Sequence, residues 1–123
     1  QTHPPAVIRQ LARVVIDLAV FDPSAARVGL AAASVMSERT DCLTLASRKV
    51  RLQAMLKTPG TLRAARRLLH QVEEPDDWTL VVDSIHRLGH HGEARAEAER
   101  QLGLGAFTAA AQAMLMSWTG RIG

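Results

Sequence analysis

Two stretches of equal length decide the fold: residues 52–69, LQAMLKTPGTLRAARRLL, and residues 81–98, VVDSIHRLGHHGEARAEA. They start 29 residues apart and share one pattern of apolar residues, a glycine and a small residue. The matched positions are Leu52, Leu56, Gly60, Ala65 and Leu69 in the first copy and Val81, Ile85, Gly89, Ala94 and Ala98 in the second. An apolar stripe, a glycine where the chain reverses and an alanine where two helices cross indicate a helical hairpin. Stacked hairpins form solenoids, which favours recognition of other chains over catalysis.

The composition indicates one folded domain. The chain has 123 residues, of which 47% are hydrophobic and 3% aromatic, so alanine and the aliphatic residues must build the core. The formal net charge of +3 is too small to demand a nucleic-acid partner. A single cysteine, Cys42, excludes an internal disulfide and fits a reducing cytosol. Charged residues within the first apolar segment argue against a signal peptide or a membrane span.

The spacing of apolar residues predicts seven helices and no strand, and hence an all-α fold. We expect three hairpins at residues 6–38, 41–72 and 77–102, followed by a closing helix at residues 106–119. The first helix carries an apolar stripe of Val7, Leu11, Val14 and Leu18. In the sixth helix, Ala94, Ala98 and Leu102 are expected to face inward. Arg95, Glu97, Glu99 and Arg100 are expected to face solvent.

A groove for a partner is expected along the first helix of each hairpin. The candidate groove residues are Val50, Ala54, Thr79, Asp83 and His86. For Val50 and Ala54 the alternative is burial in the core, because apolar stripes are usually buried.

The closing helix carries four large apolar residues, Phe107, Met114, Leu115 and Trp118. They either seal the open end of the stack, as a terminal repeat must, or contact a partner such as a co-chaperone. Both roles are compatible, with Trp118 at the rim of an interface.

Other chemistries have less support in the sequence. The histidines His86, His90 and His91 follow Asp83, but Gly89 is expected to end the helix between them, so we predict no metal site and no cofactor. A basic cluster of Arg63, Arg66 and Arg67 with His70 is more typical of a solvated face than of a nucleic-acid site. No phosphate loop or nucleophile motif is present, so we predict that the protein is not an enzyme.

Residues 78–102 resemble a tetratricopeptide repeat. Trp78 stands at the fourth position of the repeat, Gly89 at its turn, Glu93 and Ala94 at its Glu-Ala pair, and Ala98 at its small packing position. The preceding unit keeps the glycine and the alanine but has Lys49 where the tryptophan would stand. The chain therefore looks like a degenerate tetratricopeptide-like stack of about three hairpins plus a capping helix.

Within that class, the layout is similar to the small chaperones of the needle subunit in bacterial type III secretion systems. The resemblance rests on residues 7–12 (VIRQLA), Val50-Arg51-Leu52 before Gly60, the acidic proline segment before Trp78, Arg87-Leu88-Gly89, and residues 102–105 (LGLG) before the closing helix. It implies a bacterial cytoplasmic protein with two partners: a helix of the needle subunit in the groove and a small helical co-chaperone. A general adaptor that is part of a larger regulator and a basic nucleic-acid-associated domain are the alternatives.

Overall fold

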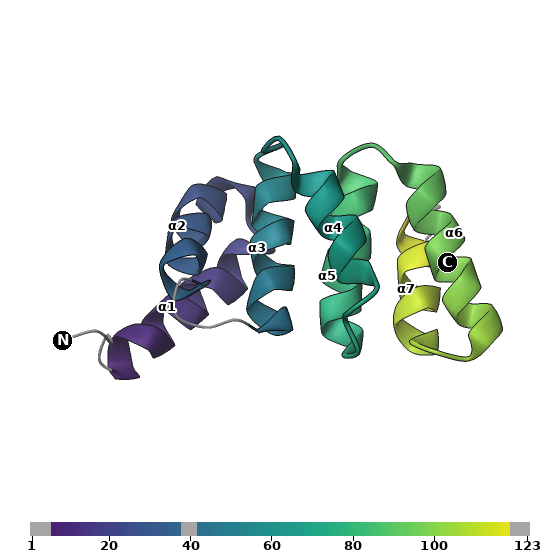
Figure 1. Cartoon of the computed structure of the whole chain (residues 1–123), viewed down its shortest axis with the longest axis horizontal. Coiled ribbons are helices and arrows are strands. Elements are labelled where there is room, and N and C mark those ends of the chain that lie inside the picture. The colour runs from purple at the N-terminus through teal and green to yellow at the C-terminus, as the bar shows by residue number, and fades with distance from the viewer. Residues whose placement is uncertain (1–5, 38–41, 119–123) are drawn as a thin grey trace.

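The computed structural model describes residues 6–37 and 42–118, which form seven α-helices, one short 3-10 helix and no strand (Figure 1). The predicted all-α fold is thereby confirmed. The elements are α1 (Ala6–Ala19), η1 (Pro23–Ala25), α2 (Ala26–Ser37), α3 (Leu43–Met55), α4 (Thr61–Leu69), α5 (Pro75–Arg87), α6 (His91–Leu104) and α7 (Thr108–Trp118). The expected limits at Glu38, Asp41 and Thr119 lie outside the described residues.

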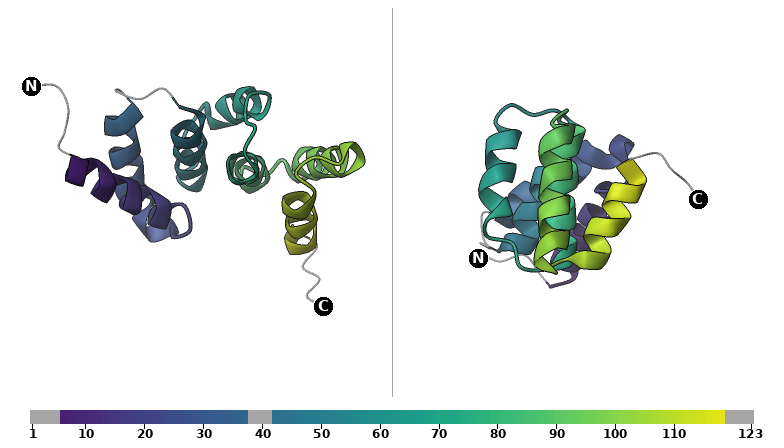
Figure 2. Two further views of the ribbon diagram at one scale, coloured as in Figure 1. Left: turned by 90° about the horizontal axis from the view of Figure 1, so that it is seen from below. Right: turned by 90° about the vertical axis from the view of Figure 1, so that its right-hand side faces the viewer.

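The helices form three consecutive hairpins, α1/α2, α3/α4 and α5/α6, and α7 closes the stack (Figures 1 and 2). Successive hairpins contact each other through adjacent helices: α2 packs on α3, and α3 and α4 pack on α5. The closing helix α7 packs on both α5 and α6. Thr44 of α3 bonds Asp77 near the start of α5, and Arg51 bonds Asp83 further along both helices. The helices α3 and α5 therefore run in parallel, as the first helices of stacked hairpins do.

Glycine residues reverse the chain at the two positions that the sequence repeat indicated. Gly60 and Gly89 have φ values of 84° and 96°, in the left-handed region that side chains other than glycine rarely adopt. On the following helices, Ala65, Ala94 and Ala98 are fully buried. The repeat thus marks the turn and the close crossing of the helices, as predicted.

The second and third hairpins share one core with α7. At its centre lies Trp78, whose side chain is fully buried and whose ring stacks on Phe107 at a centroid distance of 5.2 Å. The indole Nε1 of Trp78 donates a hydrogen bond of 3.0 Å to Glu97 Oε2 on α6. Glu97 is only 8% exposed, so the expectation that it faces solvent is wrong. Its carboxylate is turned inward because the buried indole needs an acceptor.

A second core cluster joins the first hairpin to α3 through Ile16, Ala19, Val20 and Leu52. The helices α1 and α2 approach closely at Gly29, where an added Cβ would lie 2.3 Å from Ala19 Cβ. This close approach places Ala19, together with Ile16, on the inward side of α1. As a consequence, Leu11, Val14 and Leu18 of the expected apolar stripe are exposed.

Within the described ranges, no helix is both long enough and apolar enough to cross a lipid bilayer.

Candidate functional site

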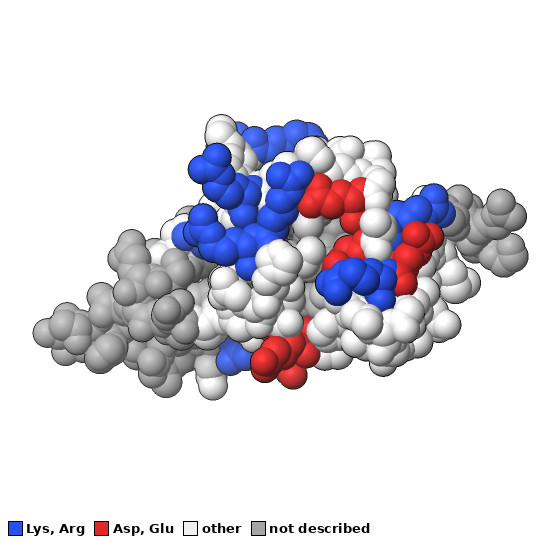
Figure 3. Space-filling model, turned by 45° about the vertical axis from the view of Figure 1, so that its right-hand side comes forward, with Lys and Arg blue, Asp and Glu red and all other residues white. Residues whose placement is uncertain are grey.

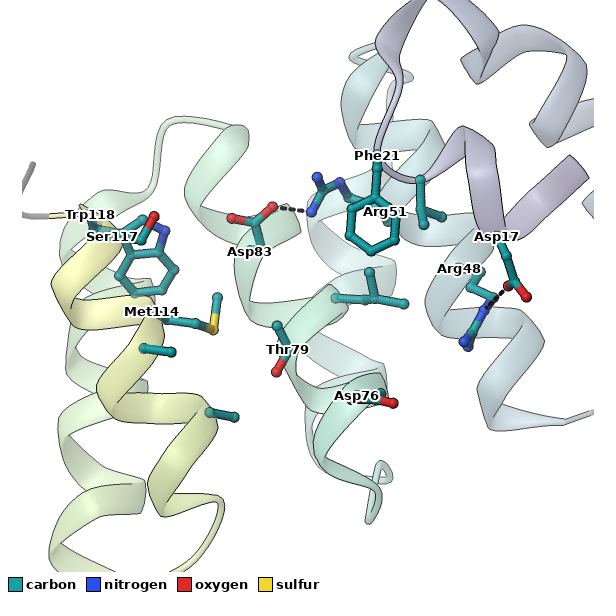
Figure 4. A pocket seen from close by; sticks show the side chains of 14 residues that line it. Asp17, Phe21, Arg48, Arg51, Asp76, Thr79, Asp83, Met114, Ser117 and Trp118 are labelled. Carbon is teal, nitrogen blue, oxygen red and sulfur yellow. Dashed lines mark hydrogen bonds and ion pairs between the residues drawn. The ribbon is translucent and has the colours of Figure 1, made fainter. Parts of the chain in front are cut away.

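A groove of about 570 Å³ runs over the first helices of the hairpins and along α7 (Figure 4). Its lining comes from four helices and the residues that follow α1. The lining residues are Asp17, Val20 and Phe21 from the first hairpin, Arg48 and Arg51 from α3, Asp76, Thr79, Leu80 and Asp83 from α5, and Ala110, Ala113, Met114, Ser117 and Trp118 from α7. The groove is thus shared by all three hairpins and the closing helix.

The walls of the groove are largely apolar. Phe21 stands on one side and is 78% exposed, while Met114 and Trp118 stand on the opposite side. Leu80 lies between them on α5 and is buried. Large apolar side chains that face each other across an open groove are typical of a surface that binds another apolar surface.

At one end of the groove floor, Arg48 forms ion pairs with carboxylates of two other helices. Its Nε lies 2.8 Å from Asp17 Oδ1 of α1, and its Nη1 lies 3.4 Å from Asp77 Oδ1 of α5. The other oxygen of the buried Asp77 accepts a hydrogen bond of 3.1 Å from Thr44 Oγ1. This arginine therefore ties the second hairpin to both of its neighbours beneath the groove.

A second ion-pair group lies nearer the ends of α3 and α5. Arg51 donates from Nη1 to Asp83, whose Oδ2 also accepts a hydrogen bond of 3.0 Å from Arg87 Nε. Arg51 is only 6% exposed, and its Nε hydrogen has no acceptor among the residues that the structure describes. Burial lowers the pKa of the Arg51 guanidinium, and the charge of Asp83 opposes this lowering. The group stays protonated at neutral pH, as arginine does in proteins.

Three rings meet where α5, α6 and α7 come together. His86 stacks on Trp118 at a centroid distance of 4.4 Å and an interplanar angle of 5°, and His91 meets His86 edge-on at 4.2 Å. These rings, together with Arg95, line a second, smaller hollow. Burial lowers the pKa of His86, and the neighbouring His91 adds to this lowering.

The structure separates the five predicted groove residues. Thr79 and Asp83 line the groove, whereas His86 lies beside it in the smaller hollow. Val50 and Ala54 are 4% and 1% exposed and lie in the interior, so these two are core residues and not groove residues. The physical reason is that their face of α3 is covered by packed neighbouring helices, whereas Arg48 and Arg51 lie along the groove.

The four apolar residues of the closing segment divide between the core and the groove. Phe107 covers Trp78, and Leu115 is partly buried against the same core. Met114 is buried in that core and also lines the groove, while Trp118 lines both the groove and the smaller hollow. The helix therefore seals the end of the stack and forms one groove wall.

Sequence reasoning missed the charged residues of the groove, Asp17, Arg48, Arg51 and Asp76, and its aromatic rim residue Phe21. A signal was present: Arg48 and Arg51 lie three residues apart and so share one side of a helix. What the sequence did not supply was their pairing with carboxylates on other hairpins.

Within the described ranges there is no cluster of metal ligands, but one face carries a basic patch. No three His, Cys, Asp or Glu side chains there gather to hold a metal ion. Arg63, Arg66 and Arg67 are exposed on α4, and Arg66 is paired with Glu93 of α6 through two hydrogen bonds of 2.7 and 2.8 Å. On the face drawn in Figure 3, basic side chains gather in one patch, and acidic groups interrupt the basic charge elsewhere.

Comparisons with known protein families, with curated proteins and with solved structures find no match.

Proposed function

We propose that the protein binds an amphipathic helix of a partner protein in the groove. The observation that carries this proposal is the groove itself: an open channel of about 570 Å³ with apolar walls contributed by the residues that follow α1, by α5 and by α7. A helix laid in a groove buries its apolar face by the same packing that joins the hairpins of the stack. Met114 favours this role, because methionine adapts its shape to an irregular partner.

The resemblance to needle-subunit chaperones supplies a specific form of the proposal. The partner would be the needle subunit of a bacterial type III secretion system, held in the cytoplasm until export. The mechanism would be masking: the groove covers the apolar face through which the subunit polymerises. This function assigns no catalytic residue and needs no cofactor.

A second, small helical partner would bind the exposed stripe on α1. Leu11, Val14 and Leu18 are 60%, 54% and 66% exposed and lie on one side of the helix. A contiguous patch of large exposed apolar residues is typical of a surface that binds another protein. The α1 stripe suits the co-chaperone better than the closing helix does, because Phe107, Met114 and Leu115 are engaged in the core.

Native mass spectrometry after co-expression with a needle subunit and its co-chaperone tests the proposal, with a 1:1:1 complex as the expected result. Ala113→Arg places a bulky charge in the groove from an exposed position and should abolish capture of the needle subunit. Gln112→Arg adds the same charge to α7 outside the groove lining and should leave the complex intact. If no complex forms, or if Ala113→Arg has no effect, the proposal fails.

The two alternatives predict different behaviour. A nucleic-acid-associated domain would use exposed residues such as Arg63 and Arg67, and its binding would weaken steeply with salt. Binding in an apolar groove changes little with salt and shows a negative heat-capacity change. A general adaptor would share the salt response of the groove but would bind helices other than the needle subunit.

A further inference from the structure

The charges of the groove are segregated along its length. At the end where α5 begins lie Asp76, which is exposed, and Asp17, which shares Arg48 with the buried Asp77. Three carboxylates against one guanidinium leave this end with an excess of negative charge. Figure 4 shows Asp76 near the start of α5 and the pair of Asp17 and Arg48 on the adjoining wall.

The opposite end carries an excess of positive charge. There Arg51, which lines the groove, and Arg87, which lies outside the lining, share one carboxylate of the lining, Asp83. Arg51 lines the groove and is buried, so solvent screens its charge less than that of an exposed arginine. Trp118 and Phe21 stand at this same end (Figure 4).

The dipole of α5 explains only part of this pattern. Acidic residues in the first turn and Arg87 in the last turn complement that dipole. Asp17 belongs to α1 and Arg51 to α3, however, so the segregation extends across the groove. Helix ends carry about half an elementary charge each, less than the full charges of the side chains, so the side chains decide the polarity of the groove.

From this polarity we infer the direction and the charge pattern of the helix that binds in the groove, an inference that rests on the proposed function. The bound helix runs parallel to α5, with its N-terminal end and basic side chains over Asp17 and Asp76. Its C-terminal end and acidic side chains lie over Arg51 and Arg87. Both the dipole of the bound helix and its side chains then meet charges of opposite sign.

The probe is a synthetic amphipathic peptide of about 15 residues, the length at which an isolated helix becomes marginally stable. It carries a leucine stripe, lysines in its first turn and glutamates in its last turn. A nitroxide is attached to one end or to the other, and quenching of Trp118 fluorescence reports which end is near. Subtracting the signal of Trp118→Phe removes the contribution of Trp78, the only other tryptophan.

We expect the nitroxide at the C-terminus to quench Trp118 several-fold more than the nitroxide at the N-terminus. Reversing both exposed charges with Asp76→Lys and Arg87→Glu should weaken binding about fivefold at low salt, as two exposed ion pairs would. As matched controls, Glu73→Lys and Arg63→Glu make the same changes at exposed positions that are outside the groove lining and, unlike Arg87, are not paired with the lining residue Asp83, so they should leave the affinity unchanged. Circular dichroism checks that each variant is folded.

The outcomes separate the inference from the function on which it rests. Equal quenching from both ends, or an affinity that charge reversal leaves unchanged, overturns the inferred direction and leaves helix binding in place. If the wild-type protein shows no saturable binding of the peptide, both the direction and the proposed function are overturned. The quenching experiment uses wild-type charges, so it decides the direction even if a charge variant fails to fold.

Discussion

The indole Nε1 of Trp78 lies 3.0 Å from Glu97 Oε2, and this hydrogen bond joins the two helices of the third hairpin inside the core. The carboxylate of Glu97 also accepts a hydrogen bond of 2.8 Å from Gln101 and forms an ion pair with Arg100 at 2.9 Å. Glu97 thus accepts the hydrogen bond of the buried indole, and its negative charge is balanced by Arg100 at the surface.

Replacing Glu97 by alanine should lower the free energy of unfolding by about 1–3 kcal/mol, because the buried Trp78 donor then has no acceptor. Glu97→Gln retains an acceptor and should lose less. Urea denaturation measures the difference, with Glu99→Ala as the control at an exposed position of the same helix, where an effect within about 0.5 kcal/mol is expected. A loss for Glu97→Ala no larger than that of the control would contradict the role of this hydrogen bond.

Gly29 should not tolerate a side chain, because an added Cβ would lie 2.3 Å from Ala19 Cβ and 3.2 Å from Leu52 Cδ2. Gly29→Ala should destabilise the protein by about 1–3 kcal/mol through overpacking, although alanine favours helix by about 1 kcal/mol.

Gly103→Ala is the matched control for Gly29→Ala. An added Cβ at Gly103 meets no atom within 4 Å, so this change should stabilise α6 by about 0.5–1 kcal/mol. Thermal unfolding of both variants measures the contrast, and equal effects would refute the close packing of α1 against α2.

Arg48 should matter more to stability than an arginine with an exposed partner. Arg48→Leu leaves the buried Asp77 with Thr44 as its remaining side-chain partner and should destabilise the fold by about 2 kcal/mol. Arg87→Leu breaks a more exposed pair, and a loss below about 1 kcal/mol is expected. Urea denaturation at low and high salt compares them, and the Arg48 effect should persist at high salt. Equal losses would show that Arg48 does not hold the hairpins together.

His86 should make the protein less stable in mildly acidic solution. Its pKa is lowered in the folded state, mainly by burial and by the neighbouring His91, so the unfolded chain binds a proton at a higher pH than the folded chain does. As the pH falls through about 6.5, the ordinary value for histidine, protonation favours the unfolded state. The slope of stability against pH should be shallower in His86→Gln than in the wild-type protein. An unchanged slope in His86→Gln would rule out this histidine as the cause.

The sequence was sufficient to predict the fold because the local signals agree with one another. Gly60 and Gly89 form the turns, because glycine adopts a positive φ without strain. Ala65 and Ala94 are fully buried where helices cross, because a small side chain lets two helices approach closely. Which face of α1 is buried is harder to predict from the sequence. Leu11, Val14 and Leu18 are more hydrophobic than Ala19, but Ala19 allows the close approach to Gly29, and packing geometry outweighs hydrophobicity there.

The candidate site was predicted only in part for a related reason. Thr79 and Asp83 lie on the first helix of a hairpin, where a groove was expected, and they do line it. Which face of α3 is covered depends on α5 and on the first hairpin together, so the sequence leaves both a groove position and a core position open for Val50 and does not single out Arg51 as a groove residue. Periodicity within one helix carries no information about contacts with helices many residues away.

The order of the hairpins has a consequence for hydrogen exchange. Each hairpin is stabilised largely by contacts with adjacent hairpins, and a terminal hairpin has such contacts on one side. Local opening therefore starts at an end of the array and not in its middle. Backbone amides of α3 and α5, which are covered on both sides, should exchange last. Amides of α1, on which Leu11, Val14 and Leu18 are exposed, should exchange first and should slow down when a partner covers these three residues. Amide protection thus offers a readout of assembly that needs no fluorescent or spin label on the protein and no knowledge of the partner's sequence.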